Sequence, residues 1–191
     1  MKSSLSANML PLVSVVLPAW NAAHTLGAAL QSLLDQRPAL HAPVPDFEVV
    51  VVDDGSTDGT RSLLEHWASG QLLGDRLRPI YAPHGGIVAA LNAGLAAARG
   101  KYIARMDADD TAHPERLACQ AAHLFDNEYI DLSATCVAFG GDRELAHGFA
   151  HFVDWQNNLL SHDQISRARF RDTPVCHPSV MLRRECVDKW G

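Results

Sequence analysis

The segment that most directly indicates the fold reads FEVVVVDDGSTDGT, over residues 47–60. It opens with an almost entirely apolar run, and the run stops at two consecutive acids, Asp53 and Asp54. A near-continuous apolar run of this length is typical of a strand that is buried on both faces of a parallel sheet. The segment therefore predicts a central strand that carries carboxylates at its carboxyl end.

Similar apolar runs alternate with amphipathic stretches on either side of this segment. Three further strands are predicted over residues 13–17, 79–81 and 102–106. Apolar residues spaced three and four apart predict helices over residues 26–34, 60–67 and 87–98. Strands and helices in this order form βαβ units, so we expect an α/β fold of the Rossmann-like type, a mostly parallel central sheet with helices on both faces.

The later elements are marked by boundary residues. Gly100 is expected to end the third helix in a left-handed conformation. Pro114 suits the first position of a fourth helix, which we expect to turn Phe125 toward the core. Residues 132–139 are predicted as a strand, whereas residues 143–165 are polar, rich in histidine and without a predicted element.

Composition and charge exclude several classes of protein. The chain has 191 residues, of which 47% are hydrophobic, which suits one well-buried domain. Sixteen Lys and Arg against 22 Asp and Glu give a net charge of −6, which offers no general basic surface for nucleic acid. The four cysteines form no Cys-x-x-Cys pair, and no apolar run approaches the roughly 20 residues that cross a bilayer. We expect a cytoplasmic protein, and a peripheral position at the inner face of the membrane is compatible with the sequence.

Acidic residues follow the second and fourth predicted strands, at the edge where an open α/β sheet binds its ligands. Asp53 and Asp54 follow one strand, and Asp107, Asp109 and Asp110 follow the other. The Gly-rich phosphate motifs Gly-x-Gly-x-x-Gly and Gly-Lys-Ser/Thr do not occur. Carboxylates on an Asp-x-Asp loop select Mg²⁺ or Mn²⁺, which can act as a Lewis acid for a leaving phosphate. Asp53 or Asp54 could instead accept a hydrogen bond from a nucleobase.

Each motif also has an ordinary structural explanation. The segment 53–58 can be an Asx-type turn followed by a helix cap, and the segment 107–109 can be a solvated acidic loop. A surface ion pair explains Arg105 best. The placement of both acidic motifs at strand ends of one sheet favours a functional role, for Asp109 in particular.

Five segments together resemble the nucleotide-sugar-dependent glycosyltransferases of family 2, which have the GT-A fold. They are residues 15–21, 51–60, 85–94, 100–110 and 174–184. The resemblance implies metal-assisted, inverting transfer of a sugar from a nucleoside-diphosphate sugar, with UDP favoured, to a saccharide or lipid-linked acceptor. It also implies a tail over residues 1–11 and one GT-A domain over residues 12–191, with the nucleotide-binding part in 12–110 and the start of an acceptor-binding part in 111–191.

The resemblance implies roles for individual residues. Those expected at the nucleotide and its sugar are Pro18, Ala19, Asn21, Asp53, Asp54, Gly85, Gly86, Asn92, Asp107 and Ala108. Asp54 is expected to contact the base more directly than Asp53, and Asp109 is the expected ligand of Mn²⁺ or Mg²⁺. His177 is expected on the acceptor side, where it could orient an acceptor or a phosphate.

One functional group of the family is not matched. Family members usually carry the carboxylate base in a Glu-Asp pair shortly after the segment that ends here at Gly191. The later acids of this chain, Asp163, Asp172, Glu185 and Asp188, do not match that pair. Loss of a general base lowers a rate by roughly 10² to 10⁴. The sequence therefore predicts a C-terminally truncated glycosyltransferase, with a catalytically impaired nucleotide-sugar binding or assembly module as the alternative.

Overall fold

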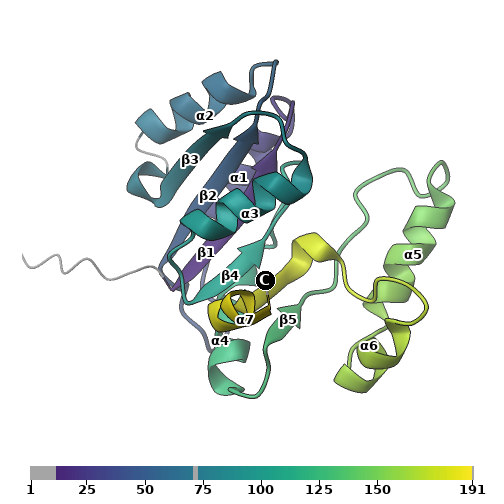
Figure 1. Ribbon diagram of the computed structural model, residues 1–191. Helices are drawn as coiled ribbons and strands as arrows, with labels where there is room; N and C mark the ends of the chain where they lie inside the picture. The colour runs from purple at the N-terminus through teal and green to yellow at the C-terminus, as the bar shows by residue number, and fades with distance from the viewer. Residues whose placement is uncertain (1–11, 71–72, 191) are drawn as a thin grey trace, which may run out of the picture.

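The computed structural model describes residues 12–70 and 73–190 and confirms an α/β fold built on one central sheet (Figure 1). Its strands are β1 (Val13–Ala19), β2 (Phe47–Asp54), β3 (Leu77–Ala82), β4 (Tyr102–Arg105), β5 (Leu132–Ala134) and β6 (Val180–Arg183). They lie in the order β3-β2-β1-β4-β6-β5. The first four strands are parallel, and β6 is antiparallel to both of its neighbours. The predicted mostly parallel sheet is therefore confirmed, while the predicted tail lies outside the described residues.

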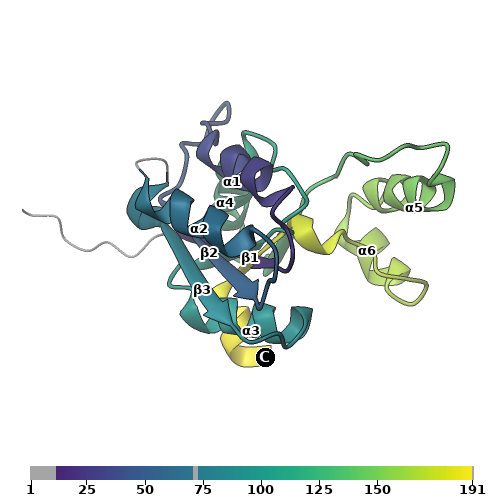
Figure 2. The same ribbon diagram turned by 90° about the horizontal axis from the view of Figure 1, so that it is seen from above.

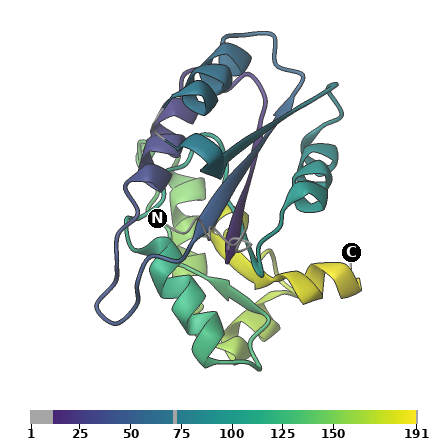
Figure 3. The same cartoon turned by 90° about the vertical axis from the view of Figure 1, so that its left-hand side faces the viewer.

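Helices cover both faces of this sheet, as predicted. They are α1 (Leu26–Leu34), α2 (Thr60–Ser69), α3 (Ile87–Ala97), α4 (Arg116–Asp126), α5 (His147–Asn157), α6 (His162–Ala168) and α7 (Arg184–Trp190), with short 3-10 turns η1 (Gly74–Arg76) and η2 (His177–Ser179). Figure 3 shows α1 and α2 on one side of the sheet and α3 and α7 on the other.

The strand residues alternate between two apolar layers. Val15 and Leu17 of β1 belong to the larger cluster, with residues of α1, α2 and α4, whereas Val16 packs in a smaller cluster with partly buried residues of α3 and α7. Leu30 of α1 is fully buried, and such burial contributes about 1.5–3 kcal/mol per side chain. The two layers hold the parallel strands rigidly and so fix where their carboxyl ends lie.

Two elements of the later chain differ from the sequence prediction. The strand predicted over residues 132–139 is wrong beyond Ala134, because its partner β6 begins at Val180, the residue opposite Ala134. The polar stretch without a predicted element, residues 143–165, contains α5 and the start of α6. Ser161 and Gln164 form a capping box at the start of α6, and this Ser-x-x-Gln signal was readable in the sequence.

Two local predictions are also wrong. Gly100 is not left-handed and lies beyond the end of α3 at Ala97. A Cβ atom there would lie 2.5 Å from the backbone nitrogen of Ser14, so close approach of two backbones, and not a turn, requires this glycine. Phe125 is 68% exposed, because α4 turns Leu124 and the polar Gln120 inward instead.

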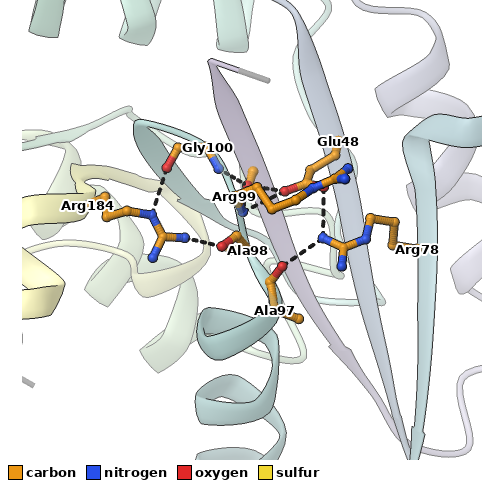
Figure 4. Close-up of polar contacts among 8 residues, drawn as sticks. Glu48, Arg78, Ala97, Ala98, Arg99, Gly100 and Arg184 are labelled. Carbon is orange, nitrogen blue, oxygen red and sulfur yellow. Dashed lines mark hydrogen bonds and ion pairs between the residues drawn. The ribbon is translucent and has the colours of Figure 1, made fainter. Parts of the chain in front are cut away.

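A network of charged groups joins the strands at the amino edge of the sheet (Figure 4). The buried carboxylate of Glu48 accepts a hydrogen bond from Ser14 Oγ at 2.6 Å and pairs with Arg78 at 3.0 Å and Arg99 at 2.6 Å. Burial would raise the pKa of Glu48, but these hydrogen bonds lower it below its ordinary value. Arg184, at the start of α7, donates to the carbonyl of Gly100 at 2.9 Å. The network thus joins β1, β2, β3, the turn before β4, and α7.

Helices α5 and α6 form an arm that stands away from the sheet and its covering helices (Figure 2). Aromatic contacts link α5 to the segments before and after the two helices, with the ring centroids of Phe139 and Phe149 5.7 Å apart and Arg171 over the ring of Trp155 at 5.4 Å. Across the helices that the structure describes, none has both the length and the apolar character to span a membrane.

Candidate functional site

The carboxyl ends of the parallel strands bring the two acidic motifs to one edge. The register pairs Ala19 of β1 with Asp53 of β2, and Val16 of β1 with Arg105 of β4, so Asp107 follows two residues later at the same edge. Because β2 and β4 both pair with β1, Arg105 of β4 and Val50 of β2, which both lie opposite Val16, are about 10 Å apart, twice the strand spacing. The predicted convergence of the acidic motifs is a feature of the fold.

Asp54 holds the loop that leads into α3. Its carboxylate accepts hydrogen bonds from the backbone N–H groups of Gly85 at 2.8 Å and Gly86 at 2.9 Å, and it lies 2.9 Å from Nδ1 of His84. The Gly85 N–H, supported by Gly86 and His84, lowers the pKa of Asp54. Both carboxylate oxygens of Asp54 thus have partners within the chain. A nucleobase that donates a hydrogen bond to Asp54 would use an oxygen that already accepts one from this loop.

Asp53 and Asn21 connect the loops after β1 and β2. Oδ1 of Asp53 accepts from the N–H of Ser56 at 3.0 Å, which is the Asx-type turn considered above. The N–H of Asn21 donates to Ser56 Oγ at 2.9 Å, and Oδ1 of Asn21 accepts from the N–H of Thr57 at 2.9 Å. Asp58 accepts from the N–H of the first residue of α2 at 3.0 Å. The segment 53–58 therefore has the structural role considered for it, while the buried Asp53 side chain still lies at the site.

Asp107, Asp109 and Asp110 form an acidic cluster on the loop between β4 and α4. One carboxylate oxygen of each lies within 4.8 Å of the others, and this is the one such group of three ligands found within residues 12–70 and 73–190. Burial raises the pKa of both Asp107 and Asp110, and the charge of Asp109 raises both further. Three carboxylates at this separation repel one another, and a divalent cation would relieve the repulsion.

The donor set of the acidic cluster fits a hard divalent cation. All three ligands are oxygens, the type that Mg²⁺ and Mn²⁺ prefer. Asp109 and Asp110 are exposed, so water and phosphate oxygens could complete the coordination. A cation held here would neutralise the charge of a leaving diphosphate.

Two arginines support the acidic cluster from the protein interior. Nη2 of Arg105 lies 2.9 Å from Oδ1 of Asp107, and the Arg105 side chain is 16% exposed. The predicted ion pair therefore exists, but it is mostly buried and not on the surface. Arg116 donates to the carbonyl of Arg105 at 2.7 Å, and burial lowers the pKa of Arg116 to about 10. Arg116 could not be predicted as a buried residue, because a single arginine on an amphipathic helix is ordinarily exposed.

The other predicted site residues are distributed around this edge. Ala19 and Ala108 are buried, Pro18 is half-buried, and Asn92 is exposed on α3. His177 begins η2, which packs against β4, and its ring is close enough to Asp107 to affect the pKa of that carboxyl. The fold therefore places the predicted acceptor-side histidine beside the acidic cluster.

An aromatic pair at the same edge was not predicted. Trp20, directly after β1, is 56% exposed and stacks on His84 with ring centroids 4.7 Å apart and an interplanar angle of 25°. Exposed aromatic faces stack well on flat ligands. The available signal was the tryptophan between Ala19 and Asn21, inside the first segment of the family resemblance.

Comparison with known proteins identifies the family. The model of Glycosyl transferase family 2 matches residues 14–191. The chain belongs to this family. It is 32% identical over 181 residues to an uncharacterized glycosyltransferase of Haemophilus influenzae, with 93% of this chain and 53% of that protein covered. The chain thus spans about half the length of that family-2 relative.

Two solved structures share the fold of this family-2 domain. The mannosyltransferase PcManGT from Pyrobaculum calidifontis, in complex with GDP-Man and Mn²⁺, has a TM-score of 0.67 at 25% identity and covers 96% of this chain and 47% of its own. TarS 1-349 of S. aureus, in complex with UDP, has a TM-score of 0.56 at 28% identity and covers 70% of this chain and 37% of its own. The predicted GT-A glycosyltransferase fold is confirmed.

The later acids of this family-2 domain lie apart from the acidic cluster. Glu185 and Asp188 are on α7, which follows β6 at the amino edge of the sheet, and Asp188 pairs there with Arg184. Asp163 is on α6 and Asp172 follows it, both exposed on the arm. That none of these acids matches the base of the family stays a prediction.

Proposed function

We propose that this chain binds a UDP-sugar at the carboxyl edge of its sheet and transfers the sugar, with inversion, to a saccharide or lipid-linked acceptor. The observation that carries the proposal is the acidic cluster at the end of β4, beside the Asp53–Asp54 strand end, in a family-2 domain. The complexes of TarS 1-349 with UDP and of PcManGT with GDP-Man and Mn²⁺ support a nucleotide-sugar donor and a divalent metal. We further propose a cytoplasmic protein that meets its acceptor at the inner face of the membrane.

Each part of the donor has its own set of residues in this proposal. The base lies near Trp20 and donates its imide N–H to Asp53 or Asp54, whose carboxylates are held in place by Ser56 and by the Gly85–Gly86 loop. Asp109 would hold Mn²⁺ or Mg²⁺, which would supply positive charge to neutralise the diphosphate, and Asp107 faces the ribose or the sugar. The residues proposed to form the surrounding wall are Pro18, Ala19, Asn21, Gly86, Asn92 and Ala108.

The acceptor side is the less complete part of the proposal. His177, beside Asp107, would orient the acceptor hydroxyl or a phosphate. The proton of that hydroxyl requires a carboxylate base, and Glu185 and Asp188 lie on α7, at the opposite edge of the sheet from the acidic cluster. That observation favours a second candidate, a nucleotide-sugar binding or assembly module with little transfer activity.

Titration of UDP with and without Mn²⁺ tests the donor site. We expect Mn²⁺ to strengthen UDP binding. Asp109→Ala should weaken the metal-dependent part of that binding by about 100-fold, the upper end of the loss in metal affinity when a residue that supports a metal site is removed. Asp126→Ala is the matched control, because Asp126 is an exposed acid at the far end of α4. UDP binding that ignores Mn²⁺ and persists in Asp109→Ala would contradict the proposal.

A turnover assay separates the two candidate functions. Acceptor-dependent release of UDP from a UDP-sugar, lost in Asp109→Ala, supports the enzyme. Metal-dependent binding of UDP without release on any saccharide or lipid-linked acceptor supports the binding module.

A further inference from the structure

Two histidines approach each other on the outer side of α5, away from the acidic cluster. His147 and His151 are one helical turn apart, and their Nε2 atoms are separated by 2.9 Å with ring centroids 4.2 Å apart. The buried residues of α5 are Ala150, Val153 and Gln156, and the last two lie on the side of the helix opposite the histidines. Both imidazoles are therefore exposed to solvent on a face that the arm leaves open.

The separation of the two nitrogens equals that of neighbouring ligands on one metal ion. Imidazole nitrogens bind metals at about 2.0–2.1 Å, so two of them at a right angle are about 2.8–3.0 Å apart, and at a tetrahedral angle about 3.3–3.4 Å. The observed 2.9 Å fits the right angle. Right-angled nitrogen ligands are typical of Cu²⁺ and Ni²⁺, and two histidines at this spacing on a helix are a known chelating arrangement.

We propose that His147 and His151 form a bidentate site for Cu²⁺ or Ni²⁺, separate in position and in donor chemistry from the oxygen ligands of the acidic cluster. At 2.9 Å the two Nε2 atoms are within hydrogen-bond distance of each other, with the proton on one of the two rings. A metal requires a lone pair on both Nε2 atoms, so that proton moves to Nδ1 of its own ring and no proton is released. Within the described part of the chain no third ligand completes the site, and water or a small anion takes the remaining positions.

Metal binding at this pair would also stabilise the start of the arm. His147 is the first residue of α5, and it follows Ala146, whose side chain has no group to cap the helix. Asp154, three residues after His151, is engaged by Arg143. A metal that joins the first and fifth residues of α5 closes its first turn, so helix formation and metal binding support each other.

Calorimetric titration with Ni²⁺ tests the site, with the exposed thiols alkylated and in the Asp109→Ala background, so that neither sulfur nor the acidic cluster competes. We expect one Ni²⁺ per chain, and His147→Ala or His151→Ala to weaken binding by about 100-fold, because a chelate becomes a single ligand. His162→Ala is the matched control, since His162 is an exposed histidine at the first position of α6. That variant should bind Ni²⁺ as the parent does.

Electron paramagnetic resonance of bound Cu²⁺ provides a second measurement that does not depend on affinity. Hyperfine coupling to two imidazole nitrogens supports the site, and coupling to one nitrogen is expected in His151→Ala. Equal affinity for Ni²⁺ in His151→Ala and its parent would overturn the proposal. So would a two-nitrogen Cu²⁺ hyperfine signal that disappears in His162→Ala. Circular dichroism of each variant verifies that α5 still forms.

Discussion

The two edges of the central sheet hold buried charge in opposite ways. At the amino edge, the single carboxylate of Glu48 meets two guanidinium groups, those of Arg78 and Arg99, and a hydroxyl hydrogen bond. At the carboxyl edge, three carboxylates of the acidic cluster gather near the guanidinium of Arg105. The amino edge therefore has its negative charge matched, whereas the carboxyl edge carries a surplus of it.

This difference separates fold from function within one sheet. A buried carboxylate with matched cations and hydrogen bonds is costly to disturb, because removal of one partner leaves the others unpaired. Surplus carboxylates at an exposed loop instead repel one another and gain from a cation that arrives with a ligand. We therefore expect substitutions at the amino edge to change stability, and substitutions at the carboxyl edge to change binding.

The largest expected effect on stability is that of Glu48→Gln. Because this change removes the negative charge that Arg78 and Arg99 share, we expect the free energy of unfolding to fall by about 3 kcal/mol. The value is at the lower end for buried pairs, since the two arginine side chains are 33% and 46% exposed. Urea denaturation measures this loss of stability. The control is Glu65→Gln in the exposed Arg61–Glu65 pair, for which we expect a loss under about 0.5 kcal/mol.

The pH dependence of this loss identifies its electrostatic origin. The pKa of Glu48 is lowered in the folded protein from its ordinary value of 4.5. The contribution of its charge is therefore complete above that value and declines as the pH falls through the lowered pKa. The stability difference between wild type and Glu48→Gln should narrow on acidification below pH 4.5, and a difference that stays constant would assign the loss to packing alone.

Gly86→Ala has an intermediate expected effect and should change both the stability of the fold and the binding of UDP. Gly86 has φ +84° and ψ 170°, a conformation that other residues rarely adopt, and a Cβ there meets nothing within 4 Å among the described residues. Backbone strain alone should lower stability by about 1–2 kcal/mol. Because the Gly86 N–H binds Asp54, UDP binding should weaken as well.

Gly74→Ala is the control for that comparison. Gly74 also has a positive φ, +52°, and an added Cβ there meets nothing within 4 Å in the part of the chain that the structure describes, but it lies in η1 before β3, at the amino edge. Its stability loss should be similar and its affinity for UDP unchanged. Equal weakening of UDP binding in both variants would show that the affinity follows general stability and not the Asp54 loop.

The parallel strands and the acidic motifs were predictable from the sequence because their signals are local. The apolar run 47–52 is long enough to mark a buried strand, and the two acids that end it stand at the carboxyl edge by the geometry of a parallel sheet. Asp107 and Asp109 follow from the same rule on β4. The relative order of the strands then brought both motifs together.

The features of the fold and the site that could not be predicted from the sequence depend on contacts between distant residues. His84 stacks on Trp20 across two loops, and Arg116 is buried because the carbonyl of Arg105 accepts its hydrogen bond. Residues 135–139 have the composition of a strand but no partner strand beside them among residues 12–70 and 73–190, since β6 begins only at Val180. Periodicity carries no information about partners of this kind.

The smallest expected change in stability belongs to Asp109→Ala, and it is the most informative because it should accompany the loss of metal-dependent UDP binding. Asp109 is exposed and lies within 4.8 Å of two like charges, so its removal deletes repulsion and exposes no buried partner. We expect the free energy of unfolding to stay within about 0.5 kcal/mol of wild type, in the direction of a gain. Urea denaturation without metal measures this, and the same measurement with Mn²⁺ and UDP should show ligand stabilisation in wild type alone. A loss in Asp109→Ala as large as that in Glu48→Gln would instead make the acidic cluster part of the framework of the fold, and the contrast between the two edges would fail.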